Sequence, residues 1–491
     1  MLIIRNYLQT CDARYFFPMT ESLNSALGTI SSVVWGPFVL IPLLLGTGLY
    51  LTIRLGGLQF RTLGRAMRHA FFDGDEEGNA GDISNYQALT TALAATVGTG
   101  NIVGVATAIS VGGPGALFWI WVTGLLGMAS KYTEAYLGVR YRVVDDKGNQ
   151  MGGPQIYLKR GIPGGFGAAL AFLFALFASI AAFGIGNLTQ GNSVAAGMED
   201  TFGVDPWITG VIMFVFTGAT LLGGIQAIGK ITSAFVPLMI VIYVVGGLVV
   251  LALLADRLPA AIALIFTDAF TGTAAQGGFV GATIMLAVRF GVARGIFSNE
   301  SGMGSAAIAA AAAKTSHPVR QGLVSMTQTF IDTLIVVSIT GLTIVASGVW
   351  DQGADTAATM TSAAFATALP GQWGGTIVSV SLIFFAFSTI IGWAYYGERS
   401  LVSLVGQWAS LPYRLLFTVV VFLSAITQIE TAWLFSDIAN GLMALPNLIG
   451  LLIMSGLVAR ETKAYMQFDP KLRKPKASVE EFIAATDMNW K

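Results

Sequence analysis

Residues 94–104 read AATVGTGNIVG, a run that places three glycines, two threonines and one asparagine within an otherwise apolar segment. A glycine inside a helix costs about 1 kcal/mol relative to alanine, and burying unpaired polar groups in hydrocarbon costs more. The run is therefore predicted to be locally unwound backbone within a membrane helix, which is tolerated only where the backbone lines a cavity.

A second stretch, residues 291–302, reads GVARGIFSNESG and has the same character. Glycines in membrane helices also serve simply to let neighbouring helices pack closely, and that alternative applies to either stretch alone. The presence of polar residues in both stretches favours unwinding in both.

The composition restricts the class of protein. Of 491 residues, 54% are hydrophobic and 11% are charged, whereas soluble domains carry roughly 25% charged residues. A soluble or disordered chain is excluded, and a polytopic helical membrane protein embedded in a lipid bilayer remains. The formal net charge of zero argues against a nucleic-acid partner. The single cysteine, Cys11, cannot form an internal disulfide, and with only two histidines beside it we expect no zinc or iron–sulfur site.

Apolar runs of about 20 residues predict eleven membrane spans. They are 32–53, 86–111, 114–139, 168–197, 205–223, 231–255, 277–313, 323–349, 373–397, 414–430 and 432–459. The first lies too far from the start to be a signal peptide.

The distribution of lysine and arginine predicts the orientation. The loops and tail on one side of these spans hold 21 of these residues and the other side holds three. Because basic residues favour the cytoplasmic side, we expect a multi-pass protein of the cell membrane with its N-terminus outside and its C-terminus in the cytoplasm.

The two unusual spans divide the chain into repeats. After a polar segment, 1–31, and an extra span with its cytoplasmic loop, 32–85, they lead two sets of five spans, 86–255 and 277–459, and a cytoplasmic tail follows over 460–491. Because five is odd, the second set enters the membrane from the opposite side. This is the pattern of an inverted repeat with its binding site at the bilayer midplane.

An ordered set of motifs over about residues 30–460 resembles the alanine or glycine:cation symporter family. The motifs are 98–104 (GTGNIVG), 112–119 (GGPGALFW), 131–134 (KYTE), 152–154 (GGP), 297–302 (FSNESG) and 392–398 (GWAYYGE). The resemblance implies sodium-coupled uptake of alanine or glycine. It also implies the leucine-transporter fold of five plus five helices with one extra N-terminal helix, eleven in all.

Sodium requires hard oxygen ligands. The ninth predicted span offers the adjacent hydroxyls of Ser388 and Thr389. Matching this sequence to the resembled fold adds the carbonyls of Ala94, Val97 and Phe385 as further sodium ligands. The alternative is that the two hydroxyls bond their own helix backbone, as serine and threonine often do in membrane helices.

The amino acid substrate is a zwitterion, so its two charged ends need different partners. We expect its carboxylate at the N–H groups of Thr99, Gly100 and Asn101, at a positive half-helix end. Its ammonium is expected at oxygens around Phe297, Ser298 and Asn299.

Two further side chains are expected at the substrate. Gln190 lies in a polar patch of the fourth predicted span and can hydrogen-bond it, and Trp393, with Phe297, can wall a small pocket that excludes larger amino acids. Packing is the alternative role for Trp393.

Charged residues within membrane spans are functional candidates. Arg294 is expected to pair with Glu300 or Asp332 as a gate, the two partners being left open. Lys131, Glu134 and Glu398 are expected to form ion pairs that gate or brace the cytoplasmic side.

The sequence therefore predicts a sodium-coupled symporter for small neutral amino acids that works by alternating access. A proton-coupled or facilitative carrier on the same fold, with a carboxylate relay through Glu300 or Asp332, is the alternative. No repeated pore loop indicates a channel, and no catalytic motif indicates an enzyme. The oligomeric state, the choice between alanine and glycine, and the preferred enantiomer do not follow from the sequence.

Overall fold

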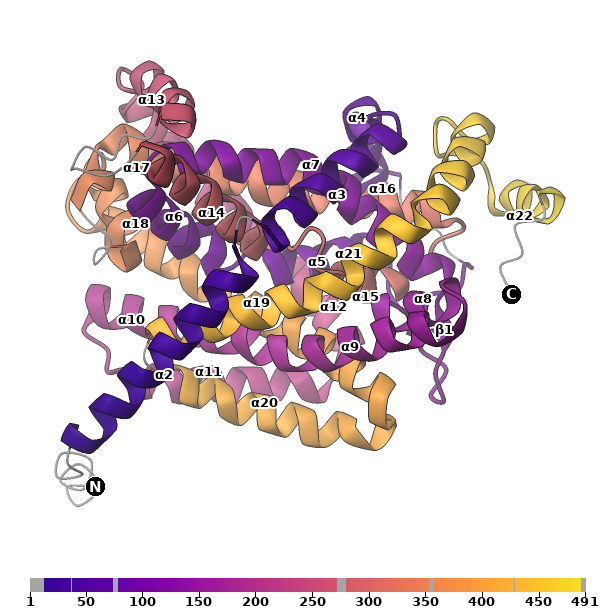
Figure 1. Ribbon diagram of the computed structural model, residues 1–491, viewed down its shortest axis with the longest axis horizontal. Coiled ribbons are helices and arrows are strands. Elements are labelled where there is room, and N and C mark those ends of the chain that lie inside the picture. The colour runs from indigo at the N-terminus through magenta and orange to yellow at the C-terminus, as the bar shows by residue number, and fades with distance from the viewer. Residues whose placement is uncertain are drawn as a thin grey trace.

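The computed structural model describes residues 13–36, 38–73, 78–271, 280–352, 357–427 and 429–486. This part is almost entirely helical, and its long helices run along the longest axis of the molecule (Figure 1). One small hairpin pairs β1 (Val143–Val144) with β2 (Gln150–Met151). Its turn is stabilised by Asp145, whose Oδ1 accepts hydrogen bonds from the N–H groups of Lys147 and Asn149.

The first half of the chain holds the helices before residue 272. They are α2 (Ala13–Val34), α3 (Leu40–Arg54), α4 (Leu58–Phe71), α5 (Asn85–Thr96), η1 (Gly100–Gly104), α6 (Val105–Gly112), α7 (Gly115–Arg140), α8 (Pro154–Gly161), α9 (Gly164–Phe183), η2 (Gly184–Leu188), α10 (Thr189–Phe202), α11 (Pro206–Leu222), α12 (Gly224–Leu253) and α13 (Leu258–Thr271).

The second half follows with α14 (Val280–Asn299), α15 (Ala306–Ala311), α16 (Pro318–Thr329), η3 (Phe330–Val337), α17 (Ser338–Ser347), η4 (Val349–Gln352), α18 (Ala357–Ala366), α19 (Trp373–Val405), η6 (Gln407–Ala409), α20 (Ser410–Ser424), α21 (Ile429–Phe468) and α22 (Lys476–Ala485).

Each predicted span coincides with one or more of these helices. Within the described residues, five helices are long and apolar enough to cross a membrane, or seven if each of two bent pairs is one span, and α11 and α13 are shorter apolar helices. The first three residues of the predicted seventh span (277–279), residue 428 of the tenth, and residues 1–12 of the N-terminal segment lie outside the described residues.

The predicted start of the first span is wrong. Helix α2 already begins at Ala13, within the segment expected to be polar and separate, and the described residues 35–36 and 38–39 between it and α3 are not helical. Gly36 lies in this stretch and precedes a proline in the sequence, a combination that ends helices because the residue before proline disfavours helical dihedrals. The apolar run 32–53 therefore covers the end of α2 and all but the last residue of α3.

The break in the second span is confirmed. Helix α5 ends at Thr96, and the helical backbone resumes at Gly100 after a bend of 51°. The break in the seventh span lies further along the chain than expected. Helix α14 continues through residues 291–299, and the irregular backbone covers residues 300–305, where Glu300, Gly302 and Gly304 have φ angles of 56°, 90° and 82°.

The expectation that only two spans are irregular is wrong. Helices α9 and α10 are joined through the π-helical segment η2, and α16 and α17 through η3. A π-helical turn widens the helix by one residue and misaligns its backbone hydrogen bonds, and such turns frequently occur at functional sites.

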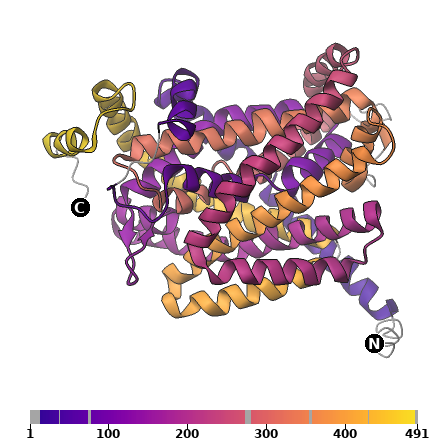
Figure 2. The ribbon, with the colours of Figure 1, turned by 180° about the vertical axis from the view of Figure 1, so that it is seen from behind.

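These irregular segments meet in the middle of the bundle. Segment η1 contacts both α14 and η3, and α5 lies against α12 and α19. The two ends of the molecule are distinct: α2 begins at the end that carries α13 and α18, whereas α4, α8 and α22 lie at the opposite end (Figure 1). The view from behind shows the same separation of the C-terminal helices from the start of α2 (Figure 2).

Candidate functional site

The break between α5 and η1 exposes backbone groups that a helix would consume. The N–H of Gly98 donates to Oδ1 of Asn101 at 2.9 Å, and the N–H of Asn101 donates to the carbonyl of Gly98 at 3.1 Å. In a continuous helix these two N–H groups would bond the carbonyls of Ala94 and Val97. The break therefore frees both carbonyls.

The freed carbonyls face α19. The Thr389 hydroxyl lies 3.0 Å from the carbonyl oxygen of Ala94, 3.4 Å from that of Val97 and 3.0 Å from that of Phe385. The Ser388 hydroxyl lies 2.8 Å from the Phe385 carbonyl. All five residues predicted as sodium ligands thus lie in one buried cluster.

This cluster has more acceptors than donors. The single proton of the Thr389 hydroxyl can be donated to only one of three carbonyl oxygens at a time. No charged side chain contributes to the cluster. Such a set of neutral, hard oxygens is suited to a monovalent cation. The Ser388 and Thr389 hydroxyls also bond the carbonyl of Phe385 in their own helix. The geometry is therefore compatible both with sodium ligands and with hydroxyls that bond their own backbone.

Gly98 lets α19 approach the break. A Cβ atom at this position would lie 2.4 Å from the Thr389 hydroxyl and 3.0 Å from Oε1 of Gln190. The same Gln190 oxygen accepts a hydrogen bond of 3.1 Å from the Thr99 N–H, while its Nε2 donates to the Ile185 carbonyl at η2. The π-helical segment therefore orients Gln190 towards the break, and the hydrogen bond from Gln190 to the substrate stays a prediction.

Asp332 of η3 links the two spans that carry the breaks, the one with Asn101 and the one with Ser298. Its Oδ1 accepts a hydrogen bond of 2.7 Å from Asn101, and its Oδ2 accepts bonds of 2.8 Å from Ser298 and 2.9 Å from Thr333. Asn299 donates to the Thr333 hydroxyl at 3.1 Å. Asn101, Ser298 and Asn299 were predicted to bind substrate, and the side chains of these three residues point to the cluster around Asp332.

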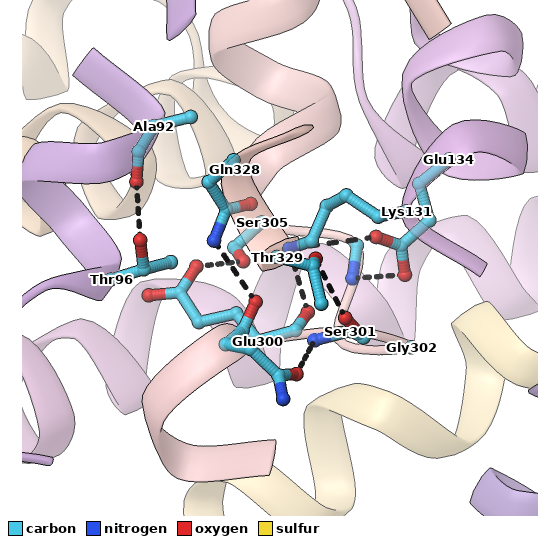
Figure 3. A network of polar contacts seen from close by, with 12 residues as sticks. Ala92, Thr96, Lys131, Glu134, Glu300, Ser301, Gly302, Ser305, Gln328 and Thr329 are labelled. Atoms are coloured by element: carbon cyan, nitrogen blue, oxygen red, sulfur yellow. Dashed lines mark hydrogen bonds and ion pairs between the residues drawn. The ribbon is translucent and has the colours of Figure 1, made fainter. Parts of the chain in front are cut away.

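The break after α14 is held by side chains around Glu300 (Figure 3). A left-handed backbone is strained for a residue other than glycine. Trp393 donates its indole N–H to Oε1 of Glu300 at 2.6 Å, and Ser305 donates to Oε2 at 2.5 Å. Lys131 donates to the Glu300 carbonyl at 3.0 Å. These contacts over-determine the conformation of Glu300.

Lys131 and Glu134 lie at this same break rather than only at the end of their span. Glu134 accepts hydrogen bonds from the N–H of Gly304 at 2.9 Å and from Asn447 at 2.8 Å, and lies 4.0 Å from the Lys131 ammonium. Asn447 also donates to the Gly302 carbonyl at 2.8 Å. Glu398 instead pairs with Arg414 at 2.7 Å, near the end of α19.

The predicted partners of Arg294 are wrong. Its guanidinium forms two hydrogen bonds of 2.9 Å with Asp437 of α21. Glu300 lies beyond the end of α14, and its carboxylate is taken by Trp393 and Ser305. The Asp332 carboxylate is taken by Asn101, Ser298 and Thr333. The Arg294 guanidinium also stacks 4.4 Å from the ring of Trp433.

Phe297 covers Gly100 and pairs with Trp433, whose ring lies near Gly104. The rings of Phe297 and Trp433 are 4.6 Å apart, and a Cβ at Gly100 would lie 3.0 Å from the Phe297 ring. Trp393 is fully buried and packs its Cβ against Gly186, where an added Cβ would lie 2.0 Å away. Both aromatic residues predicted as pocket walls are thus central, Phe297 over η1 and Trp393 beside Glu300.

Comparison with known proteins places this geometry in a family. The model of the sodium:alanine symporter family matches residues 20–479. A sodium/alanine symporter, AgcS, of Methanococcus maripaludis is 51% identical over 445 residues, covering 90% of this chain and 97% of that protein. The chain belongs to the sodium:alanine symporter family. It is thus a member of a family of membrane transporters.

Relatives within the sodium:alanine symporter family carry different names. A probable sodium/glutamine symporter, GlnT, of Bacillus subtilis is 35% identical to this chain over 450 residues and covers 91% of each chain. Among solved structures, MhsT in complex with L-phenylalanine is similar with a TM-score of 0.53 at 13% identity, covering 78% of this chain and 99% of that one. This likeness shows that the family member described here has a leucine-transporter-like fold.

Sequence reasoning missed four residues that the structure places at the breaks of this symporter-family chain: Asp437, Trp433, Asn447 and Gln328, the last of which donates to the Asn299 carbonyl at 3.3 Å. A carboxylate in the predicted eleventh span was a signal for Asp437, because charges within membrane spans are rarely without function. The other three carry no comparable signal, since single amides and aromatics are common in packed helices.

Proposed function

We propose that this protein is a sodium-coupled symporter that imports small neutral amino acids, alanine and glycine, by alternating access. The cluster of Ala94, Val97 and Phe385 carbonyls around the Thr389 hydroxyl is the observation that carries the proposal. Sodium would occupy this cluster and bridge α5 to α19. Membership in the sodium:alanine symporter family supports both the ion and the substrate class.

The substrate would lie between the two breaks. Its carboxylate would be bound at the start of η1 by N–H groups of Thr99, Gly100 and Asn101. The Thr99 N–H, which donates to Gln190, and the Asn101 N–H, which donates to the Gly98 carbonyl, would exchange these partners for the carboxylate. Its ammonium would face oxygens of Phe297, Ser298 and Asn299, next to Asp332. Phe297 and Trp393 would limit the size of the side chain that fits, because overpacking a buried pocket is costly.

In the membrane, we propose eleven spans: α3, then five spans from α5 to α12 and five from α14 to α21, the second five inverted relative to the first. The two spans that carry the breaks would then face each other, and the contact between η1 and α14 supports this arrangement. The end that carries α13 and α18 would be extracellular, and the end that carries α4, α8 and α22 cytoplasmic. The protein would be located in the cell membrane.

Arg294 and Asp437 would close the extracellular side over the site. The pair lies beside Phe297, which covers Gly100. Opening this side then requires α14 and α21 to separate, because the pair joins these two helices.

Uptake of labelled alanine into proteoliposomes tests the proposal. Accumulation is expected with an inward sodium gradient and not with a matched potassium or proton gradient. Equal accumulation with a proton gradient would favour the alternative, in which Asp332, a buried carboxylate that the structure pairs with amide and hydroxyl donors, carries the proton. Alanine that equilibrates without accumulation under every gradient would indicate a facilitative carrier.

A further inference from the structure

A cleft of about 870 Å³ lies between the α3–α4 corner and α21, away from the breaks described above. Helix α4 turns by 81° from α3 at Gly56 and Gly57, which both have φ of 64°. This left-handed backbone suits glycine. The corner turns α4 away from the direction of α3 (Figure 1).

The charges that line the cleft are all of one sign. Its lining contains the basic residues Arg54, Arg61, Arg65, Arg460 and Lys463 and no carboxylate. Within the described part of the chain, no ion pair involves any of these five. Arg61 and Arg65 donate only to backbone carbonyls, those of Gly56, Pro470 and Arg61 itself. Five like charges around one cleft repel each other unless an anion lies between them.

Exposed apolar side chains lie on the same helices, close along the chain to residues that line the cleft. Ile53 of α3 and Ile453 of α21 are 70% and 53% exposed, and each precedes a cleft residue, Arg54 and Gly456, by no more than three positions. Phe60 on α4 is 60% exposed. A soluble anion would use only the charges, whereas a molecule with an anionic head and apolar chains would use both features.

We propose that this cleft binds an anionic glycerophospholipid. Its phosphate lies among the five basic side chains, and its acyl chains lie along Ile53 and Ile453. The arginine guanidiniums offer paired N–H donors to phosphate oxygens. The bound lipid fastens α4 to α21. The inference does not depend on which solute or ion the protein transports.

Native mass spectrometry of the purified full-length protein tests this, with phosphatidylglycerol as the probe and phosphatidylethanolamine and phosphatidylcholine for comparison. The test variant is Arg460→Gln with Lys463→Gln, two exposed side chains of α21. At roughly 1 kcal/mol per basic residue, the double variant is expected to bind phosphatidylglycerol about 30-fold more weakly. The matched control is Lys159→Gln with Arg160→Gln, which removes the same charge from exposed positions of α8 and should bind like the wild type.

Three results would overturn the proposal. They are equal binding of phosphatidylglycerol by the wild type and the test variant, equal loss in the control variant, and displacement of the lipid by inorganic phosphate at similar concentration, which would assign the cleft to a soluble anion. Thermal unfolding of each variant checks that it is folded. If the double variant does not fold, Arg54→Gln alone is measured, with an expected loss of about fivefold and no loss as the contradicting result.

Discussion

The guanidinium of Arg294 on α14 and the carboxylate of Asp437 on α21 form two parallel hydrogen bonds of 2.9 Å. Both side chains are largely buried, with residue exposures of 5% and 8%. Removing one partner of a buried ion pair leaves an uncompensated charge, whereas removing both leaves none. The difference in stability between the single and double variants therefore shows whether the two side chains interact as an ion pair.

Asp437→Asn and Arg294→Gln are each expected to destabilise the protein by about 3–5 kcal/mol, and the double variant by less than the sum of the two. Thermal unfolding in detergent measures the three variants. As a functional readout, a cysteine placed near Gly100 should react faster from outside in the single variants. Additive destabilisation with unchanged labelling would show that the pair does not close the site.

Thr389→Ala removes the hydroxyl that lies within 3.4 Å of three carbonyl oxygens. We expect the sodium concentration for half-maximal alanine uptake to rise about tenfold or more, since a lost ligand worth about 1.4 kcal/mol has that effect. Thr389→Ser keeps the hydroxyl and is the matched control. Uptake by Thr389→Ala with unaltered sodium dependence would show that sodium binds elsewhere.

Gly98→Ala places a Cβ 2.4 Å from the Thr389 hydroxyl. Since α19 must then move away from the break, we expect uptake to be lost while the protein still reaches the membrane. Gly46→Ala is the control, because a Cβ there meets no atom within 4 Å and alanine favours the helix by about 1 kcal/mol. If Gly98→Ala transports normally, the close approach of α19 is not required for transport.

Trp393→Ala should let larger neutral amino acids compete with alanine for uptake, because it removes a buried ring next to Glu300. Trp393→Phe separates size from hydrogen bonding, since it keeps an aromatic ring and loses the indole N–H. We expect the phenylalanine variant to keep the narrow competition profile. A profile that is the same in wild type and Trp393→Ala would assign the side chain to packing alone.

Asp145 gives a pH-dependent contact outside the membrane. Burial alone would raise its pKa, but hydrogen bonds from Arg399 and from the backbone N–H groups of Asn149 and Lys147 outweigh burial, so its pKa is lowered from the ordinary value of 3.8. A carboxyl with a depressed pKa stabilises the folded state above its unfolded pKa, and this stabilisation is lost as pH falls through the folded pKa.

We therefore expect the hairpin of β1 and β2 to stay protected from hydrogen exchange at neutral pH and to lose protection only below about pH 4. Asp145→Asn should already lack this protection at pH 7, because the ion pair with Arg399 at 2.8 Å is absent. Protection in the variant equal to the wild type at pH 7 would contradict the assignment.

The features that were predictable from the sequence depend on the local chemistry of each segment. The glycines and polar residues at 98–101 cannot continue a membrane helix without cost, so the break there was predictable within a few residues. Ser388 and Thr389 were predictable as candidate site residues because their adjacent hydroxyls lie in the middle of an apolar span. That residues 94–97 and 385–389 lie together was expected from the family resemblance and not from local chemistry, and the bundle shows the contacts between them.

The second break shows the limit. Residues 291–299 also combine glycines with a hydroxyl and an amide side chain, yet they remain helical. The break falls at Glu300, where Trp393 and Lys131 supply partners from other helices and Ser305 supplies one from the break itself. The partner of Arg294 was likewise undetermined by the chain, because Asp437 is 143 positions away. Composition and periodicity determine which segments enter the membrane, since burial of apolar surface depends on each segment alone. Tertiary structure decides which polar groups form hydrogen bonds or ion pairs with each other. The reason is that a buried charge or a strained backbone is stable only next to partners from other helices.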